Sequence, residues 1–243
     1  MCELPPDSPR RSLGGRVTPL QIVILIPAHS TEAKFTYDLA QLCIYTAMSM
    51  PPDEGNSLGL FMVPGTYVHS ARQELAELAL AREGLTHCLW LDADMRFPAD
   101  TIIRLLQRDK NVVGINYSKR AIPPDYVAIK HFPENNEGVG KKCVTTADST
   151  GLEEVDAIGM GVVLMTASAF NGLPDPKQDR WFWFKQLPDG KQMGEDVYFC
   201  DMLRKAGQKI YVDHDLSTDC SHIGNFEYRC AHAEAEYRSE GLL

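Results

Sequence analysis

Two aspartates one residue apart, Asp92 and Asp94, directly follow an apolar run at residues 88–91. Because side chains alternate along an extended segment, we expect both carboxylates to project the same way. In an open α/β sheet, ligands bind beyond the carboxyl ends of the strands, where this pair would emerge. Two carboxylates there suit a hard divalent cation whose remaining ligands are substrate phosphates. Asp is also common in solvated turns after strands, so the pair alone leaves both interpretations open.

Further acidic residues and histidines that could belong to a functional site lie later in the chain. Glu195 and Asp196 begin a segment with an amphipathic helical pattern. From the pattern alone, acids at that place complement the helix dipole, and the helix N-terminus would keep the pKa of Asp196 low. His222, within Ser-His-Ile-Gly, is either a metal ligand or a polar residue of a surface turn. His214, within Asp-His-Asp, is the rival ligand.

Other residues also have two interpretations. Gly159 and Gly161 would let a backbone approach a ligand closely, or they allow a bulge or tight packing. The Trp-Phe-Trp-Phe cluster at 181–184 fits a lid or a stacking surface, and equally a hydrophobic cluster beneath a long loop. Lys119 and Arg120 could meet phosphate or remain solvated charges.

Alternating strands and helices are expected to position these residues. The first strand begins at residue 20, is almost wholly apolar and is stopped by Pro27. Strands that alternate with helices along the chain predict a parallel α/β sheet with right-handed crossovers. The remaining elements expected in this half are strands at 58–63, 86–91 and 111–117, and helices at about 34–50, at 70–84 and from about residue 100.

The second half is less regular. Residues 121–150 have the composition of an irregular hairpin insertion, and residues 174–193 form a loop rich in Pro and aromatic residues. We expect strands at 156–166 and 209–212 and helices at 195–205 and 227–240. The domain organisation expected is a disordered leader at 1–19, one domain at 20–226, and a C-terminal helix at 227–243.

Composition narrows the class of protein. The 243 residues carry a formal net charge of −9, which argues against broad attraction to nucleic acid or anionic membranes but permits a local basic groove. Seven cysteines without a Cys-x-x-Cys pair fit reduced thiols better than a disulfide framework or a structural zinc site. The apolar run at 22–26 is too short to span a bilayer. We therefore expect a soluble, intracellular protein with no membrane span.

Five motifs occur in a characteristic order. A strand ends in Ile-Pro-Ala-His, a helix begins with Ser-Ala-Arg, and a strand ends in Asp-Ala-Asp, followed by Gly-Glu-Asp at 194–196 and Ser-His-Ile-Gly at 221–224. Over about residues 20–224 this order resembles the nucleotide-sugar-dependent glycosyltransferases of the GT-A fold, in particular compact family 2-like enzymes of phages and bacteria. The resemblance implies an α/β, Rossmann-like, mostly parallel sheet flanked by helices, with an irregular second half.

The resemblance also implies roles for individual residues. The cofactor would be Mn²⁺ or Mg²⁺, with an imidazole ligand favouring Mn²⁺. Asp196 would be the base of an inverting reaction, with Glu195 beside it, or would only orient the acceptor in a retaining one. The metal ligands would be Asp94 and His222, with Asp92 close by. The residues expected to bind the nucleotide-sugar are Pro27, Ala28, His29, Arg72, Asp92, Ala93, Asp94 and Gly161.

We therefore expect a glycosyltransferase that uses a nucleoside diphosphate sugar, first of all a UDP-sugar, in the cytoplasm of a bacterial or phage-infected cell. The acceptor would be a glycan or a hydroxymethylated pyrimidine in phage DNA. One alternative is a nucleotidyltransferase, but Pro-Ala-His-Ser at 27–30 is not the Gly-rich, basic loop typical of one. The other alternative is a non-catalytic nucleotide-sugar-binding protein.

Overall fold

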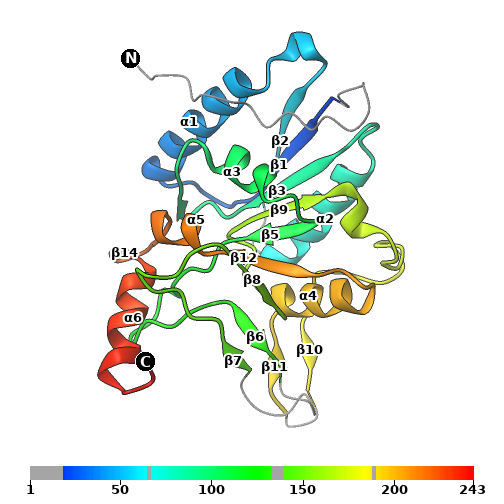
Figure 1. The fold of residues 1–243 in the computed structure, drawn as a ribbon. Helices are drawn as coiled ribbons and strands as arrows, with labels where there is room; N and C mark the ends of the chain where they lie inside the picture. Colours follow the sequence, from blue (N-terminus) through cyan, green and yellow to red (C-terminus); the bar gives the residue numbers. More distant parts are fainter. Residues whose placement is uncertain (1–18, 65–66, 133–139, 188–189) are drawn as a thin grey trace.

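A seven-stranded sheet with helices on both faces forms the centre of the molecule in the computed structural model (Figure 1). The structure describes residues 19–64, 67–132, 140–187 and 190–243, so the expected leader lies outside the described residues except for Pro19. The strand order is β2-β1-β3-β9-β5-β12-β8. The strands of this sheet are β1 (Gln21–Pro27), β2 (Ser57–Val63), β3 (His87–Leu91), β5 (Val112–Gly114), β8 (Leu152–Val155), β9 (Val162–Thr166) and β12 (Ile210–Asp213).

The sheet is mostly parallel, as the sequence predicts. β1 pairs in parallel with β2 and β3, and β5 pairs in parallel with β12. The exceptions are β9, which is inserted antiparallel between β3 and β5, and β8, which is antiparallel to β12 at the edge. The antiparallel strands follow the hairpin region, where an irregular return replaces the crossover helix that a parallel connection requires.

Helices cover both faces because alternate residues of the central strands point to opposite sides. Residues 22–26 are all fully buried, as expected for a central parallel strand. They divide between two core clusters, one containing Phe35 and Ile102, the other Leu75 and Phe199. The helices and 3-10 turns are α1 (Ala33–Ser49), η1 (Pro52–Glu54), α2 (Val68–Leu80), α3 (Thr101–Gln107), η2 (Ala167–Phe170), α4 (Glu195–Lys205), α5 (His214–Asp219) and α6 (Cys230–Ser239).

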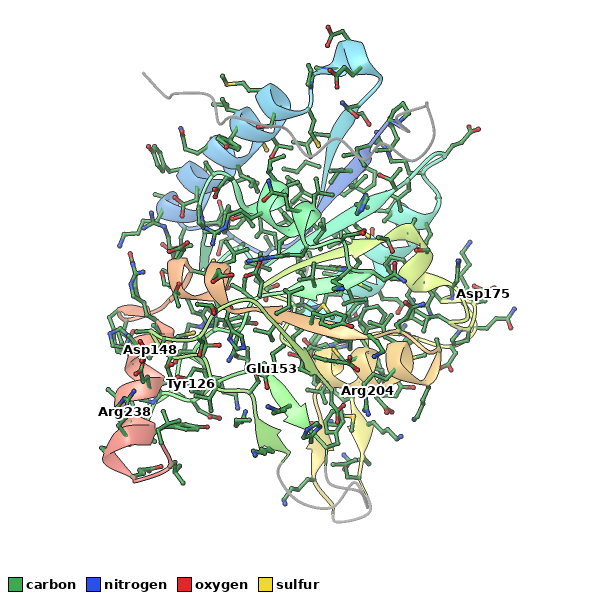
Figure 2. All side chains as sticks on the ribbon, viewed as in Figure 1. Tyr126, Asp148, Glu153, Asp175, Arg204 and Arg238 are labelled. Carbon is green, nitrogen blue, oxygen red and sulfur yellow. The ribbon has the colours of Figure 1, made fainter. Side chains whose placement is uncertain are left out.

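Three small sheets accompany the large one within the described residues. They are β14-β13-β4, β6-β7 and β10-β11, with bounds β4 (Met95–Arg96), β6 (Ile129–His131), β7 (Lys141–Lys142), β10 (Lys185–Gln186), β11 (Gln192–Met193), β13 (Ser221–Ile223) and β14 (Glu227–Tyr228). The expected C-terminal helix begins at Cys230 rather than at residue 227, because residues 227–228 pair with β13. Tyr126, labelled in Figure 2, packs edge-on against Tyr237 of α6, with ring centroids 5.2 Å apart.

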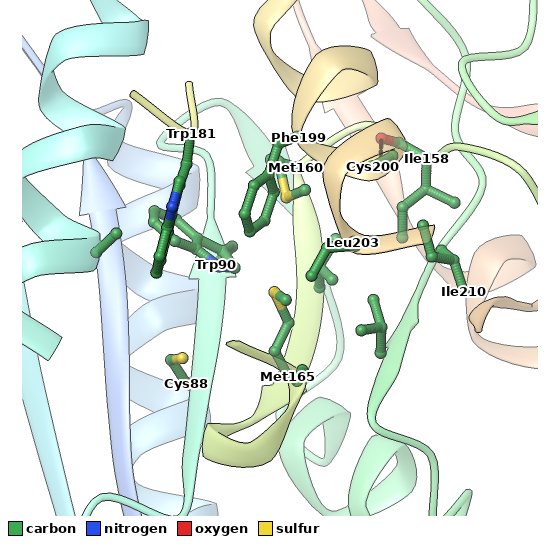
Figure 3. Packing of buried hydrophobic residues seen from close by; sticks show 14 of the residues in the cluster. Cys88, Trp90, Ile158, Met160, Met165, Trp181, Phe199, Cys200, Leu203 and Ile210 are labelled. Carbon is green, nitrogen blue, oxygen red and sulfur yellow. Dashed lines mark hydrogen bonds between the residues drawn. The ribbon is translucent and has the colours of Figure 1, made fainter. Parts of the chain in front are cut away.

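The aromatic cluster at 181–184 divides into a buried half and an accessible half. Trp181 and Phe182 are buried in the core, where Trp181 stacks on Phe199 (Figure 3) and Phe182 packs against Trp90 with ring centroids 5.1 Å apart. Trp183 is 45% exposed. For the first two rings, the hydrophobic-cluster interpretation is therefore correct and the stacking surface is not.

Two global expectations can be compared with the described part of the chain. The six cysteines it contains are all free thiols. None of its helices combines the length and the apolar character needed to cross a bilayer.

Candidate active site

Asp92 and Asp94 lie in a turn after β3, and their side chains face different partners. The Met95 backbone N–H donates to the Asp92 carbonyl at 3.1 Å, which closes the turn before β4. Asp92 faces Arg72, whereas Asp94 faces His222. The two carboxylates thus have different partners, and the chain turns where the alternation argument assumed an extended strand.

A short antiparallel pairing brings His222 to Asp94. Strand β13 pairs with β4 so that His222 lies opposite Met95, and the Ile223 backbone N–H donates to the Asp94 carbonyl at 2.6 Å. The His222 Nε2 atom consequently lies 3.3 Å from Asp94 Oδ2. Two residues that are far apart in the sequence thus meet beyond the carboxyl end of β3.

The tautomer of His222 follows from its second contact. Its Nδ1 lies 3.1 Å from the Ser118 carbonyl oxygen, which can only accept a hydrogen bond. Nδ1 therefore carries a proton, and in the neutral ring Nε2 presents its lone pair toward Asp94. A lone pair facing a carboxylate oxygen requires a proton or a cation between them. Metal-binding histidines are commonly oriented by such a bond from the other ring nitrogen, so the pair fits a divalent ion.

Arg120 supplies positive charge at the same carboxylate. Its Nη1 lies 3.0 Å from Asp94 Oδ2, and its side chain is 49% exposed. Burial acts to raise the pKa of Asp94. When a proton rather than a cation lies between Nε2 and Asp94, the hydrogen bond and charge of His222, together with the charge of Arg120, lower this pKa overall. Asp94 is thus held as a carboxylate, the form that binds a cation.

Arg72 joins the first carboxylate to helix α4. It is 4% exposed, its Nη2 donates to Asp92 Oδ2 at 3.1 Å, and its Nε lies 3.7 Å from Glu195 Oε1. Burial acts to lower the pKa of Arg72, but the charges of Asp92 and Glu195 raise it overall. The buried Nε and Nη1 make no hydrogen bond to any residue that the structure describes. Nε still faces the Glu195 carboxylate, so Nη1 is the donor best suited to receive an anion, since an unpaired buried donor costs about 1–3 kcal/mol.

Asp196 is the second residue of α4 and has a high pKa. Burial raises the pKa to about 6, and the charge of Glu195 adds to the effect. The charge of Arg72 and a 2.7 Å hydrogen bond from the Val197 backbone N–H oppose this shift without reversing it. The expectation that the helix N-terminus keeps this pKa low is therefore wrong. A carboxylate that titrates near pH 6 is well suited to exchange protons.

Tyr117 lies among the candidate carboxylates and was not singled out from the sequence. It is buried, and its ring packs edge-on against His222, with centroids 5.3 Å apart. Burial raises its pKa well above the ordinary value, and the charges of Asp92, Asp196 and Asp94 raise it further. These carboxylates therefore all lie around one ring. The only sequence signal was its position as the last residue of a predicted strand.

Gly159 and Gly161 provide the space for Tyr117. A Cβ at Gly161 would lie 2.9 Å from the Tyr117 ring, and one at Gly159 would overlap its hydroxyl. Tight packing thus accounts for both glycines. The Gly161 carbonyl also accepts a 2.9 Å hydrogen bond from the Asp92 backbone, so this glycine lies within the site.

The remaining predicted residues lie at the edge of this arrangement or away from it. Pro27 ends β1, Ala28 is buried, and His29 is exposed. Ala93 lies between the two aspartates and is partly buried. Their roles in binding stay predictions. His214 belongs to another cluster, where its Nε2 lies 3.0 Å from a carboxylate oxygen of Glu153.

No protein-family model and no curated protein matches the chain. Among solved structures, A197 from STIV matches with a TM-score of 0.52 and 13% identity, over 85% of this chain and 86% of that one. GalNAc-T7 with UDP, GalNAc and Mn²⁺ has a TM-score of 0.49 and 11% identity, over 86% of this chain and 45% of that one. A glycosyltransferase involved in glycosylation of the major capsid of PBCV-1 has a TM-score of 0.31 and 13% identity, over 62% of this chain and 61% of that one.

These likenesses concern the fold. The match to A197 extends over most of both chains, and at 13% identity it says nothing about activity. The TM-scores of the two glycosyltransferases are too low to add an argument. The α/β sheet flanked by helices is confirmed, whereas the role of each side chain depends on the chemistry of the site.

Proposed function

We propose that this chain is a metal-dependent glycosyltransferase that moves a sugar from a nucleoside diphosphate sugar, first of all a UDP-sugar, to an acceptor hydroxyl. The observation that carries the proposal is the pairing of His222 Nε2 with Asp94 Oδ2 at 3.3 Å, with Nδ1 committed to a carbonyl. A carboxylate and an imidazole lone pair that face each other suit Mn²⁺ or Mg²⁺. When bound, such an ion stabilises the charge of a diphosphate leaving group.

Two arginines are placed to act on the same leaving group. The buried Nη1 donor of Arg72 suits a phosphate oxygen, and Asp92 holds this guanidinium in position through Nη2. Arg120, which is exposed and paired with Asp94, is free to turn toward phosphate once a cation takes over the charge of that carboxylate.

Asp196 is the proposed base. It accepts the proton of the acceptor hydroxyl as the oxygen attacks the anomeric carbon, and the bond from that carbon to the diphosphate breaks. Its pKa of about 6 supports this role, because the group is ionised at neutral pH and still basic enough to take a proton. If Asp196 only orients the acceptor, the reaction retains configuration, which the anomeric configuration of the product would show.

Metal-coupled donor binding tests the proposal. UDP at about 100 times its Kd should stabilise the protein by roughly 2.7 kcal/mol in Mn²⁺, and much less in EDTA. We expect Asp94→Asn to abolish the difference between the two melting temperatures. Asp53→Asn, which changes an exposed aspartate of η1, is the matched control and should retain it. Equal UDP shifts with and without metal would contradict the role of Asp94.

The two alternatives predict different products. A panel of nucleotide sugars, incubated with Mn²⁺ or with chelator, should release UDP only with the metal. A nucleotidyltransferase would instead form pyrophosphate from a nucleoside triphosphate and a sugar phosphate. A non-catalytic binding protein would show the thermal shift but no release from any donor.

A further inference from the structure

A second group of metal-ligating side chains lies beside β8 and contains His214 and Glu153 but no residue of the candidate active site. Cys143 directly follows β7, Glu153 belongs to β8, and His214 begins α5. One ligand atom from each lies within 4.8 Å of the others. Glu153 is labelled in Figure 2. Cys143 is fully buried, His214 is 4% exposed, and Glu153 is partly accessible.

The three side chains converge on a single oxygen. Cys143 Sγ lies 3.6 Å from Glu153 Oε2, and His214 Nε2 lies 3.0 Å from the same atom. Tetrahedral zinc, with bonds of about 2.3 Å to sulfur and about 2.0–2.1 Å to nitrogen or oxygen, separates sulfur from oxygen by about 3.5 Å and nitrogen from oxygen by about 3.3 Å. The observed Sγ–Oε2 and Nε2–Oε2 distances therefore differ from those of a zinc site by only a few tenths of an ångström.

We propose that Cys143, Glu153 and His214 bind a Zn²⁺ ion in a site distinct from the one at Asp94. A thiolate, a carboxylate and a neutral imidazole together balance the charge of the ion. This mixed sulfur, nitrogen and oxygen donor set is one that zinc accepts and that Mg²⁺ or Ca²⁺ does not favour. Solvent would take the fourth position on the accessible side of Glu153.

The surroundings of His214 allow it to bind a metal. Its Nδ1 lies 2.9 Å from Thr145 Oγ1, and the same hydroxyl accepts a 3.1 Å hydrogen bond from Asn116 Nδ2. Because a hydroxyl both donates and accepts, Thr145 can pair with either tautomer of His214. Without metal, the Nε2 proton is donated to Glu153. With zinc, Nδ1 carries the proton and Nε2 coordinates.

The electrostatics of this cluster predict which proton is released when zinc binds. Burial raises the pKa of Cys143 well above its ordinary value, and the charge of Glu153 raises it further, so the metal-free cysteine is a thiol. Zinc replaces the thiol proton, which leaves to solvent, while the imidazole proton only moves from one ring nitrogen to the other. Lys130 pairs with the other oxygen of Glu153, Oε1, so that Oε2 stays available.

Zinc at this site would join three segments of the irregular second half. It would link the chain after β7, the edge strand β8 and the start of α5. Asn116 also donates to the Cys143 carbonyl at 2.9 Å. Two residues later in the chain, the Ser118 carbonyl orients His222. The proposed ion would therefore support the backbone that carries part of the candidate active site.

Cobalt substitution tests the site independently of activity. Chelator-treated full-length protein titrated with Co²⁺ should show a thiolate-to-cobalt charge-transfer band and tetrahedral d–d bands, which stoichiometric Zn²⁺ removes. Cys143→Ser should abolish the charge-transfer band. Cys43→Ser, which removes a partly exposed thiol of α1, and Asp94→Asn, which alters the other proposed site, should both keep it.

A second variant tests the site even if Cys143→Ser fails to fold. Thr145→Val retains all three ligands and removes only the hydroxyl behind His214, so we expect roughly 10–100-fold weaker cobalt binding with the charge-transfer band intact at saturation. Absence of the band in wild-type protein, or a band that survives Cys143→Ser, would overturn the proposal. Neither result bears on the glycosyltransferase assignment, which is tested through Asp94 and UDP.

Discussion

The ionisation of Asp196 determines the pH at which it can accept a proton. Burial, together with the charge of Glu195, raises the pKa of Asp196 to about 6. As pH falls through this value, the carboxylate is protonated and can no longer act as a base. We therefore expect kcat/KM for sugar transfer to fall about tenfold per pH unit below pH 6 and to level off above it. A pH profile at saturating Mn²⁺ measures this.

Replacing the same residue separates a base from a positioning group. Asp196→Asn keeps the shape and removes the proton acceptor, so kcat should fall by roughly 10²–10⁴-fold, with little change in UDP-sugar binding. The acidic limb of the pH profile should vanish in the residual activity. Near-normal turnover by this variant would exclude Asp196 as the base and favour the retaining route.

Some individual residues could be identified before the fold was known, and others could not. Asp94 and His222 were expected to meet, and the structure brings them together. The pKa of Asp196 was misjudged, because the helix dipole is visible in a sequence whereas the burial that outweighs it depends on the packing of distant segments. Tyr117 was overlooked for the same reason. Its environment is created by glycines more than 40 residues away.

Secondary structure elements were predicted best where the hydrophobic pattern of the sequence is long and continuous. The helix expected at 34–50 is α1 at Ala33–Ser49, and the strand expected at 86–91 is β3 at His87–Leu91. β8 was missed, and β9 was not expected to be antiparallel. The direction of a strand depends on the connection before it, which here is an irregular insertion with weak local signals.

The pairing between β4 and β13 brings His222 to Asp94, and no local pattern in the sequence predicts it. Each strand is only two or three residues long, and they are separated by more than a hundred residues. Pairings this short are stabilised by tertiary context rather than by propensity. The sequence could predict that Asp94 and His222 meet only through the family resemblance.

Substitution of Gly159 tests how the residues before β9 position Tyr117. A Cβ there would overlap the Tyr117 hydroxyl, so Gly159→Ala should destabilise the protein by about 1–3 kcal/mol, as measured by urea unfolding. Tyr117→Phe removes the overlapped oxygen. The double variant should therefore be more stable than the sum of the two single changes predicts. Strict additivity would mean that the alanine is accommodated by another movement.

The net charge and the surface of the whole molecule bear on the acceptor. A charge of −9 weakens nonspecific attraction to DNA. Several groups that could stack on a base or meet phosphate are engaged within the protein. Trp181 and Phe182 are buried, Lys119 pairs with Asp125, and Arg120 pairs with Asp94.

One surface remains suited to stacking. Trp183 is exposed, Arg180 lies over its ring at 4.9 Å from the centroid, and His69 packs edge-on against it at 5.1 Å. An exposed aromatic ring flanked in this way can stack on a sugar as well as on a base. Because the net charge of −9 weakens attraction to a phosphate backbone, this arrangement favours a saccharide acceptor over DNA.

We therefore expect transfer to a saccharide hydroxyl, and little or none to hydroxymethylated pyrimidines in DNA. The enzyme would be incubated with a panel of UDP-sugars and Mn²⁺ together with either oligosaccharides or DNA that contains 5-hydroxymethylcytosine or 5-hydroxymethyluracil. Mass spectrometry of the glycans and of the digested nucleosides would detect a hexose-sized gain. Trp183→Ala should raise KM for the saccharide and leave UDP-dependent thermal stabilisation unchanged, because the ring would contact the acceptor and not the nucleotide. A hexose on a DNA nucleoside, with no gain on any glycan, would reverse the assignment and identify the acceptor as modified DNA.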